Sequence, residues 1–171
     1  MDDFSRFILA WDLKTDMAAG SLIDVIQKAV DLTVMTDVPV EDRTVLLSDN
    51  GPGYISRQFG EYLRLVGIRH IIASPYHPQT NGKMERYHRT VKEEIGQLPY
   101  EMPSALEQAI SSFVEYYNYW RYHEGLGNVT PFDVYTGRHL EIIRNRKEVK
   151  SRTLEARKEY NRAIRQQSSG L

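Results

Sequence analysis

Apolar positions recur along the chain with two spacings, and the spacing predicts the secondary structure. Short apolar runs over residues 7–11, 44–48 and 68–73 predict three buried strands. Apolar residues at helical spacing over residues 16–35 and 56–66 predict helices between those strands. Strands that alternate with helices indicate an α/β domain in which helices pack on a sheet.

Individual residues mark where these elements begin and end. Thr15 is the expected N-cap of the first helix, and Gly67 is expected to stop the second one because glycine readily adopts a left-handed backbone. The cluster Asp49–Gly53 predicts a turn directly after the second strand. A polar, proline-punctuated loop is expected over residues 74–82.

Three further helices are expected over residues 81–97, 103–122 and 138–167. The middle one carries a group of aromatic residues that could stack on bases but whose helical spacing favours core or helix packing. This group consists of Phe113, Tyr116, Tyr117, Tyr119, Trp120 and Tyr122.

The composition excludes several classes of protein. The chain of 171 residues has no cysteine, so it has neither a disulfide framework nor a thiolate metal site. No apolar run is long enough to span a bilayer, and the N-terminus lacks the basic segment of a signal peptide. We therefore expect a cytosolic protein that does not contact a membrane.

The net charge of −1 hides a strong asymmetry. Residues 1–137 carry 12 Lys and Arg against 19 Asp and Glu, whereas residues 138–171 carry 10 against 4. A basic arm on an acidic body usually has nucleic acid as its partner. A solvated helix with Glu and Lys or Arg at pairing distance explains the same charges. Both interpretations divide the chain into a domain over 1–137 and a basic helical tail over 138–171.

Two carboxylates stand in positions suited to chemistry. Asp49 ends a predicted buried strand, which is where ligands bind in α/β sheets, although Asp-Asn-Gly is also good turn chemistry. Glu85 lies in the first turns of the helix 81–97, beside cations. It could be a surface partner of Arg89 or a metal ligand with Arg89 and Lys92 reaching for phosphates.

The helix around Glu85 has two adjacent faces. At 100° per residue one face spans about 100° of arc and carries Asn81, Glu85, His88, Arg89 and Lys92. The other is apolar, is expected to pack on the sheet, and carries Met84, Val91, Ile95 and Leu98. Mg²⁺ and Mn²⁺ prefer carboxylate oxygens, and phosphodiester transfer by two metals needs acidic side chains from different elements.

The motifs around these carboxylates are similar to those of a known family. The segment 47–52, the 35 residues between Asp49 and Glu85, and the segment 76–86 resemble the D,D-35-E pattern of DDE-type transposases and retroviral integrases. Residues further along resemble the insertion-sequence transposase branch, namely Tyr117, Asn118, Arg121, His123, Leu126, Gly127, Thr130 and Pro131. Residues 2–6 resemble the stretch that enters the family's third strand, so the similarity covers residues 1–137.

The resemblance implies a ribonuclease H-like mixed sheet with flanking helices and metal-dependent cutting and joining of DNA strands. It implies that Asp49 and Glu85 are catalytic and hold Mg²⁺ or Mn²⁺. The side chains it places toward DNA are His77, Asn81, Lys83, Arg86, Arg89 and Lys92. Its implied partners are DNA, further copies of the chain or a full-length transposase, in the cytoplasm of a bacterium at the nucleoid.

The chain departs from the family pattern at its start. The family's first catalytic aspartate lies upstream of the segment that matches residues 2–6, and neither Asp2, Asp3 nor Asp12 matches it. We therefore expect a fold without the first strand and most of the second, and a chain that is inactive as it stands. The alternative to an active enzyme is a remnant that binds DNA or a full-length partner.

Overall fold

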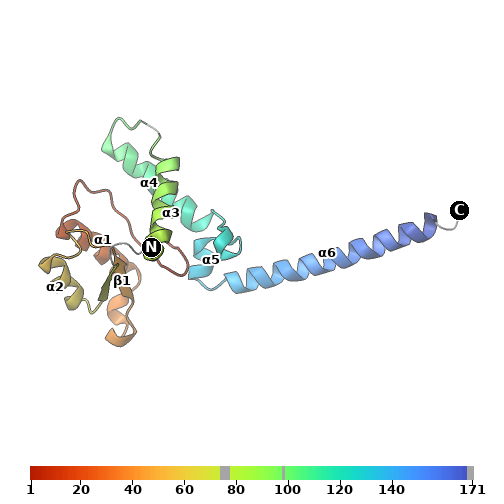
Figure 1. Ribbon diagram of the computed structural model, residues 1–171, viewed down its shortest axis with the longest axis horizontal. Coiled ribbons are helices and arrows are strands. Elements are labelled where there is room, and N and C mark those ends of the chain that lie inside the picture. Colours follow the sequence, from red (N-terminus) through yellow and green to blue (C-terminus); the bar gives the residue numbers. More distant parts are fainter. Residues whose placement is uncertain (74–77, 98, 169–171) are drawn as a thin grey trace. The chain divides into compact units, whose positions relative to one another are not determined.

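The computed structural model describes residues 1–73, 78–97 and 99–168, without the side chains of 78–81, 167 and 168 (Figure 1). It contains two compact units, Met1–Tyr116 and Tyr117–Leu171. Its elements in chain order are α1 (Ala19–Leu32), the 3₁₀ helices η1 (Met35–Asp37) and η2 (Val40–Asp42), β1 (Val45–Ser48), α2 (Arg57–Leu65), β2 (Arg69–Ile72), α3 (Pro78–Glu94), α4 (Pro103–Tyr119), η3 (Glu124–Leu126), α5 (Pro131–Tyr135) and α6 (His139–Ser168).

The described part of the chain is mostly helical, with one two-stranded sheet. β1 and β2 are parallel and pair from Val45↔Arg69 to Ser48↔Ile72. This confirms the strands predicted over 44–48 and 68–73. The α/β class is confirmed too, although the sheet described is parallel rather than mixed.

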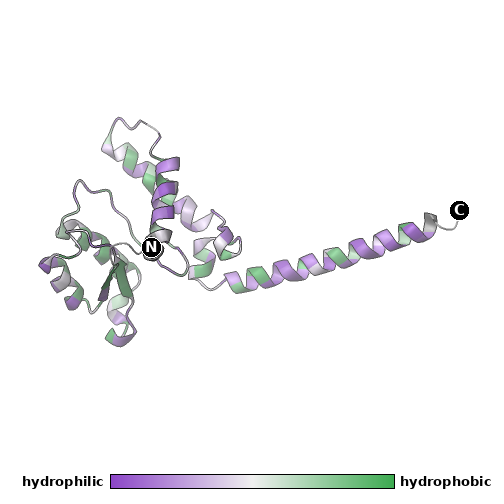
Figure 2. Ribbon diagram, viewed as in Figure 1, coloured by the Kyte–Doolittle hydropathy of each residue, from purple (hydrophilic) through white to green (hydrophobic). Residues whose placement is uncertain are grey.

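The core of the first unit lies between α1, α2 and one face of the sheet. Five buried apolar residues form its centre, namely Leu22, Val30, Phe59, Leu63 and Ile68. Figure 2 shows hydrophobic residues gathered on α1 and β1 of this unit. Phe59 is 0% exposed, so its truncation to alanine would cost about 3–5 kcal/mol.

The other face of the sheet is bare in the described residues. Leu47 and Ile71, which are register partners, remain 41% and 56% exposed. Leu46 and His70, the pair next to them, turn the opposite way, since side chains alternate along a strand. Leu46 packs against the core cluster, so the sheet is covered on one side only.

α2 begins and ends where its sequence predicts. The Ser56 hydroxyl accepts a hydrogen bond from the Phe59 amide at 3.2 Å, which satisfies one unpaired donor of the first turn. Gly67 ends the helix with φ of +64°, and a Cβ there would lie 2.7 Å from Nη1 of Arg43. Both the conformation and the close approach therefore require glycine.

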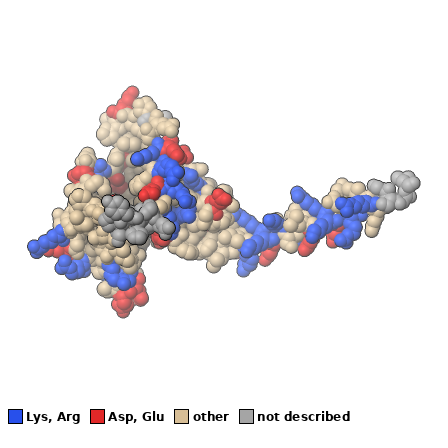
Figure 3. Space-filling view, in the orientation of Figure 1, with Lys and Arg blue, Asp and Glu red and all other residues tan. Residues whose placement is uncertain are grey.

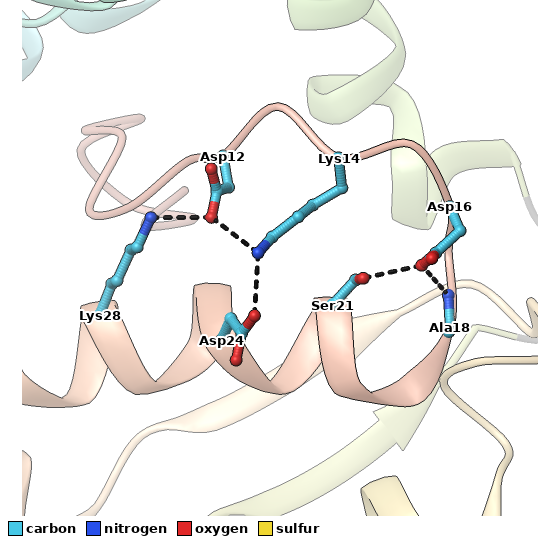
Figure 4. Close-up of polar contacts among 7 residues, drawn as sticks. All are labelled: Asp12, Lys14, Asp16, Ala18, Ser21, Asp24 and Lys28. Carbon is cyan, nitrogen blue, oxygen red and sulfur yellow. Dashed lines mark hydrogen bonds and ion pairs between the residues drawn. The ribbon is translucent and has the colours of Figure 1, made fainter.

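α1 begins later than expected, and Thr15 does not cap it. The helix begins at Ala19, and the Asp16 carboxylate accepts hydrogen bonds from the Ala18 amide at 2.9 Å and the Ser21 hydroxyl at 2.7 Å (Figure 4). A carboxylate is the better acceptor beside the positive end of a helix. The N-cap position itself is Ala18, which has no side-chain cap hydrogen bond, so the cap predicted at Thr15 is wrong.

The strand predicted over residues 7–11 is wrong. Phe7 and Ile8 are both 6% exposed, so their burial is confirmed. A strand, however, requires a neighbour along the ladder, and the described residues form a ladder only between β1 and β2. The segment instead follows a turn in which Asp2 accepts hydrogen bonds from the amide and the hydroxyl of Ser5 at 2.7 and 2.6 Å.

α3 begins at Pro78, inside the segment expected to be a loop, and ends at Glu94 rather than at Gln97. Proline is favoured at the first position of a helix because its missing N–H would have no partner there. The apolar face is buried mainly toward its C-terminal end: Ile95 is 6% exposed and Met84 is 37% exposed. Leu98, the last residue of that face, lies outside the described residues.

The aromatic residues of α4 and its C-terminal extension divide into two groups. Phe113 and Tyr117 are buried, which confirms the packing interpretation for these two residues. The other four, Tyr116, Tyr119, Trp120 and Tyr122, are between 44% and 69% exposed, so they are not core residues. The Tyr119 ring nevertheless packs on Phe132 of α5, with centroids 4.9 Å apart, which agrees with helix packing for this residue. α4 ends at Tyr119 instead of Tyr122, and the chain then turns through η3. Aromatic residues beyond the helix no longer share its buried face.

The second unit contains α5 and the long helix α6. Thr130 and Asp133 form a reciprocal capping box at the start of α5. Beyond Ile143 the side chains of α6 are exposed as far as they are described, and Figure 3 shows its Lys and Arg interspersed with acidic residues. The helix confirms the secondary structure predicted for the tail, while the domain boundary at 137 stays a prediction. No helix among the described residues could cross a membrane.

Candidate functional site

Asp49 follows the last residue of β1 and is exposed, as predicted. Its Oδ1 accepts a hydrogen bond from the Gly51 amide at 2.9 Å, and the turn closes with a bond from the Tyr54 amide to the Gly51 carbonyl at 3.0 Å. The turn therefore holds the carboxylate by one oxygen at the carboxyl end of a strand. Such an end is a rigid support for a ligand-binding side chain.

Ser48 and His70 lie directly beneath this turn. The Ser48 hydroxyl donates to the carbonyl oxygen of Asp49 at 2.7 Å and lies 2.8 Å from Nε2 of His70. Ser48 is 7% exposed, and burial lowers the pKa of His70 from 6.5. Sequence reasoning missed both residues. The signal was the alternation along the strands, which turns Leu46, Ser48 and His70 to one face.

Tyr54 completes the surroundings of Asp49. Its ring meets Phe59 edge-on with centroids 5.4 Å apart. Burial raises the pKa of the Tyr54 hydroxyl from 10.0, and the negative charge of Asp49 raises that pKa further. The phenol therefore stays protonated near neutral pH and is able to donate a hydrogen bond.

Glu85 lies on an exposed face of α3 together with cations. Glu85, His88, Arg89 and Lys92 line one open groove, which Glu93 and Gln97 extend. This confirms that the four predicted residues share a face. Asn81 belongs to the same helix, but its side chain lies outside the described residues. A carboxylate next to two cations suits a phosphodiester, because the cations can neutralise phosphate while the carboxylate holds metal.

The remaining residues predicted to contact DNA differ from one another in their surroundings. The Lys83 ammonium pairs with the Asp3 carboxylate at 2.7 Å, and both side chains are largely exposed. An exposed pair of this kind stabilises the fold by less than about 1 kcal/mol, so phosphate could displace Asp3. Arg86 is exposed, and His77 lies outside the described residues.

The donor set fits part of a metal site. Asp49 and Glu85 offer hard carboxylate oxygens, the kind that Mg²⁺ and Mn²⁺ prefer, and both side chains are exposed. No group of three or more His, Cys, Asp or Glu residues that could hold a metal occurs in the described parts of the chain. The two carboxylates can thus supply some of the ligands, with the remainder from water, phosphate or a further carboxylate.

Arg121 and His123 are held within the second unit. The Arg121 guanidinium lies 5.9 Å from the centroid of the Tyr117 ring, and the His123 ring meets the same ring edge-on at 4.8 Å. The His123 backbone bridges to Val129. These contacts hold both side chains against the Tyr117 ring.

Comparison with protein families gives one description for most of the chain. Residues 1–78 and residues 66–131 each match a profile described as integrase core domain. Together the two matches extend from the N-terminus to the start of α5. They include Asp49, Ser48, His70 and Glu85.

Three of the curated relatives are retroviral polyproteins. The chain is 33% identical over 98 residues to the Gag-Pro-Pol polyprotein of squirrel monkey retrovirus, covering 57% of this chain and 5% of that protein. It is 35% identical over 95 residues to the Gag-Pro-Pol polyprotein of Mason-Pfizer monkey virus, covering 56% and 5%. It is 32% identical over 98 residues to an equine infectious anemia virus Pol polyprotein, covering 57% and 8%. The chain therefore spans less than a tenth of these relatives' length.

Solved structures show the same fold. The catalytic core domain of BIV integrase is 24% identical with a TM-score of 0.53, covering 77% of this chain and 80% of that one. The HTLV-2 integrase catalytic core domain in complex with magnesium, in a trimeric form, is 19% identical with a TM-score of 0.52, covering 72% and 74%. A simian T-cell lymphotropic virus intasome in complex with PP2A regulatory subunit B56 gamma is 20% identical with a TM-score of 0.55, covering 70% and 41%.

Proposed function

Because the chain belongs to the integrase core domain family, we propose that it is a polynucleotidyl transferase that cleaves and joins DNA strands. Asp49 and Glu85 are its metal-holding catalytic carboxylates. The observation that carries the proposal is the placement of these two residues. One is exposed at the end of a parallel strand, and the other is exposed on a helix face beside Arg89 and Lys92. Mg²⁺ or Mn²⁺ bound there supplies Lewis-acid stabilisation of charge on the phosphate oxygens.

The chain's own residues account for binding and orientation. The Gly51 amide donates a hydrogen bond to one carboxylate oxygen of Asp49. The turn thereby sets the direction of the second carboxylate oxygen. Arg89 and Lys92 lie one turn and two turns beyond Glu85 on α3, where they neutralise the phosphates on either side of the scissile bond. In the proposal, the contact with DNA phosphates extends to four further residues, namely His77, Asn81, Lys83 and Arg86.

Magnesium, DNA and self-association are also proposals for this chain. One similar structure is a catalytic core in complex with magnesium in a trimeric form, and another is an intasome. Those protein assemblies support an oligomer that acts on DNA with a divalent cation. A cytoplasmic location is part of the same proposal.

We also propose that the chain is a transposase of the insertion-sequence branch. The support is the sequence from Tyr117 to Pro131, which resembles the segment downstream of the catalytic glutamate in that branch. The three polyprotein relatives described above are retroviral, so the branch is tested by substrate. Preferential binding to inverted-repeat element ends over retroviral-type ends supports the branch, and equal binding to both contradicts it.

A second candidate is a chain that binds DNA, or a full-length partner, without cutting. It is favoured by the described residues, which form no group of three metal-ligating side chains. Two carboxylates hold one ion weakly, and a displacement that needs two ions then fails.

The test is a nicking and strand-transfer assay with the whole chain, supercoiled plasmid and Mn²⁺. We expect Asp49→Asn and Glu85→Gln to lower the rate at least about a hundredfold, because metal stabilisation of several kcal/mol is lost at ~1.4 kcal/mol per factor of ten. Asp37→Asn is the control, since Asp37 is an exposed carboxylate of η1 outside the site.

The outcomes separate the two candidates. Manganese-dependent nicking that the two site variants lose supports the transferase. Binding to DNA with no nicking by the wild-type chain supports the non-catalytic candidate. Nicking that survives in both Asp49→Asn and Glu85→Gln shows that the site is misassigned.

A further inference from the structure

We propose that His70 is a positioning residue for Asp49, acting through the Ser48 hydroxyl. The proposal rests on the function assigned to Asp49 and adds two residues to that site. In it, His70 and Ser48 fix the main chain from which the carboxylate projects, and so set its direction toward a divalent cation.

The order of donors follows from the two distances at Ser48. Its hydroxyl carries one hydrogen and donates it to the carbonyl oxygen of Asp49 at 2.7 Å. The contact of 2.8 Å between the same hydroxyl and Nε2 of His70 must then have the histidine as donor. The chain of bonds therefore runs from His70 Nε2–H to Ser48 Oγ–H to the Asp49 carbonyl, and it requires a hydrogen on Nε2.

The imidazole is held in place by packing. The His70 ring meets Phe59 edge-on with centroids 5.6 Å apart and lies 6.5 Å from the Tyr54 ring. Phe59 is 0% exposed and sits in the core between α1 and α2. The core therefore fixes the donor, and the sheet register pairs His70 with Leu46, two residues before Ser48 and on the same face of the sheet.

A hydrogen bond to the Asp49 carbonyl restrains the main chain at the residue where it leaves the sheet. β1 ends at Ser48, so past this residue the main chain leaves the ladder and enters the turn. The Ala73 amide anchors Ser48 itself, by a bond of 2.7 Å to its carbonyl. The Ser48 hydroxyl then carries the restraint one peptide further, to the residue that presents the carboxylate. Groups that orient a metal ligand in this way typically change metal affinity by about 10- to 100-fold.

The first experiment reads the histidine directly in the whole chain. Nitrogen-15 shifts of the His70 ring, measured near neutral pH, are expected to show the hydrogen on Nε2. A ring with its hydrogen on Nδ1 would overturn the proposal. The carbonyl carbon shift of Asp49 is expected to move in both Ser48→Ala and His70→Phe and to stay unchanged in Ser48→Thr, which keeps the hydroxyl.

The second experiment measures Mn²⁺ affinity by paramagnetic broadening of the amide signals around Asp49. His70→Phe keeps a ring between Tyr54 and Phe59 but removes the donor, and it is expected to weaken binding about tenfold. His70→Gln restores an N–H donor and is expected to recover most of the affinity. The double variant with Ser48→Ala should bind no more weakly than the weaker single variant, because both break one chain of bonds.

A matched control removes a similar hydrogen bond elsewhere in the first unit. Tyr62→Phe deletes the bond of 2.8 Å from the Tyr62 hydroxyl to Gln27, which joins α2 to α1. It should lower stability about as much as His70→Phe and leave Mn²⁺ affinity unchanged. Equal affinity in His70→Phe and the wild type, or an equal loss in Tyr62→Phe, overturns the positioning role.

The two proposals fail in different ways. If the wild-type chain shows no Mn²⁺ binding that depends on Asp49, the proposed function fails. The ring tautomer and the Asp49 carbonyl shift then still decide whether His70 positions the turn. If Asp49-dependent binding is present but insensitive to His70, the proposed function stands and the positioning role is wrong.

Discussion

Arg43 shows how one side chain can tie three segments together. Its guanidinium donates from Nε to the Val38 carbonyl at 2.8 Å, from Nη1 to the Val66 carbonyl at 2.7 Å and from Nη2 to the Thr36 carbonyl at 3.0 Å. Val66 is the residue that follows α2, and Thr36 belongs to η1. The planar fork of arginine matches three acceptors at once, which a lysine ammonium cannot do.

We therefore predict that Arg43→Ala lowers the free energy of unfolding by about 2–4 kcal/mol, since hydrogen bonds from a charged donor contribute about 1.5–3 kcal/mol each and are not additive. Arg43→Lys should recover less than half of this loss. Urea unfolding followed by circular dichroism measures both. Arg57→Ala, which removes an exposed pair with Glu61, is the control, and a loss as large as that of Arg43→Ala would contradict the account.

At the scale of elements, the segment before α1 is joined to that helix by charge. Asp12 lies 2.8 Å from the Lys28 ammonium and 3.3 Å from that of Lys14, which also reaches Asp24 at 2.8 Å (Figure 4). The hydrogen bond from Lys28, and secondarily the one from Lys14, lowers the pKa of the Asp12 carboxyl below 3.8. The Asp12 side chain is only 16% exposed, while its partners reach solvent and are screened by salt.

A depressed carboxyl pKa makes stability depend on pH in one direction. The stability from Asp12 is fully present above pH 3.8 and is lost as the pH falls through the lower pKa of the folded state. We predict that the urea concentration at the unfolding midpoint falls less steeply below pH 3.8 in Asp12→Asn than in the wild type. Adding 0.5 M salt should reduce this difference between the two proteins. Asp37→Asn is the control, and an identical acid slope in Asp12→Asn and the wild type would show that these pairs do not act on stability.

Elements with local signals were predictable, and elements that need a distant partner were not. β1, α2 and β2 follow from a β-branched apolar run, the Ser56 cap and Gly67, all of which act within a few residues. Residues 7–11 carry the same kind of apolar run, but a strand also needs a neighbour, and no local pattern reports whether one is present.

In the candidate site, too, local features were predictable from the sequence, and contacts between distant residues were not. The placement of Asp49 and Glu85 was predictable because each occupies a distinctive local position, a strand end and a helix face, while their metal-binding role stays a prediction. The contact between Ser48 and His70 joins residues 22 apart in sequence and depends on the register of two strands. Thr15 was predicted as the cap of a helix starting at residue 16, but α1 begins at Ala19, so Thr15 lies too far from the first turn to cap it.

At the scale of the whole molecule, five of the nine basic residues of α6 lie along one side of the helix. At 100° per residue, five of them fall within about 60° of arc, namely Arg144, Lys147, Lys158, Arg162 and Arg165. Four glutamates occupy the neighbouring arc, namely Glu141, Glu148, Glu155 and Glu159. A stripe of this kind can face phosphates along its length while the rest of the helix stays in water.

We predict that replacing the five basic residues by glutamine weakens binding to duplex DNA. The slope of log affinity against log salt should fall in magnitude by up to about 4.5, because each phosphate contact contributes about 0.9. Fluorescence anisotropy of a labelled duplex at several KCl concentrations measures the slope. Replacing the four glutamates by glutamine is the matched control and should not reduce it. An unchanged slope in the fivefold variant would assign the DNA contacts to α3 instead.

The bare face of the two-stranded sheet has a consequence for the chain in bulk solution. Leu47 and Ile71 form an exposed apolar strip on the two paired strands. A strand whose edge is unpaired is a template for aggregation with another molecule. A net charge of −1 supplies almost no mutual repulsion near neutral pH. The solubility of the chain therefore depends on the negative charge that it gains as the pH rises. Moving from pH 7 to pH 9 should raise the concentration at which the chain precipitates.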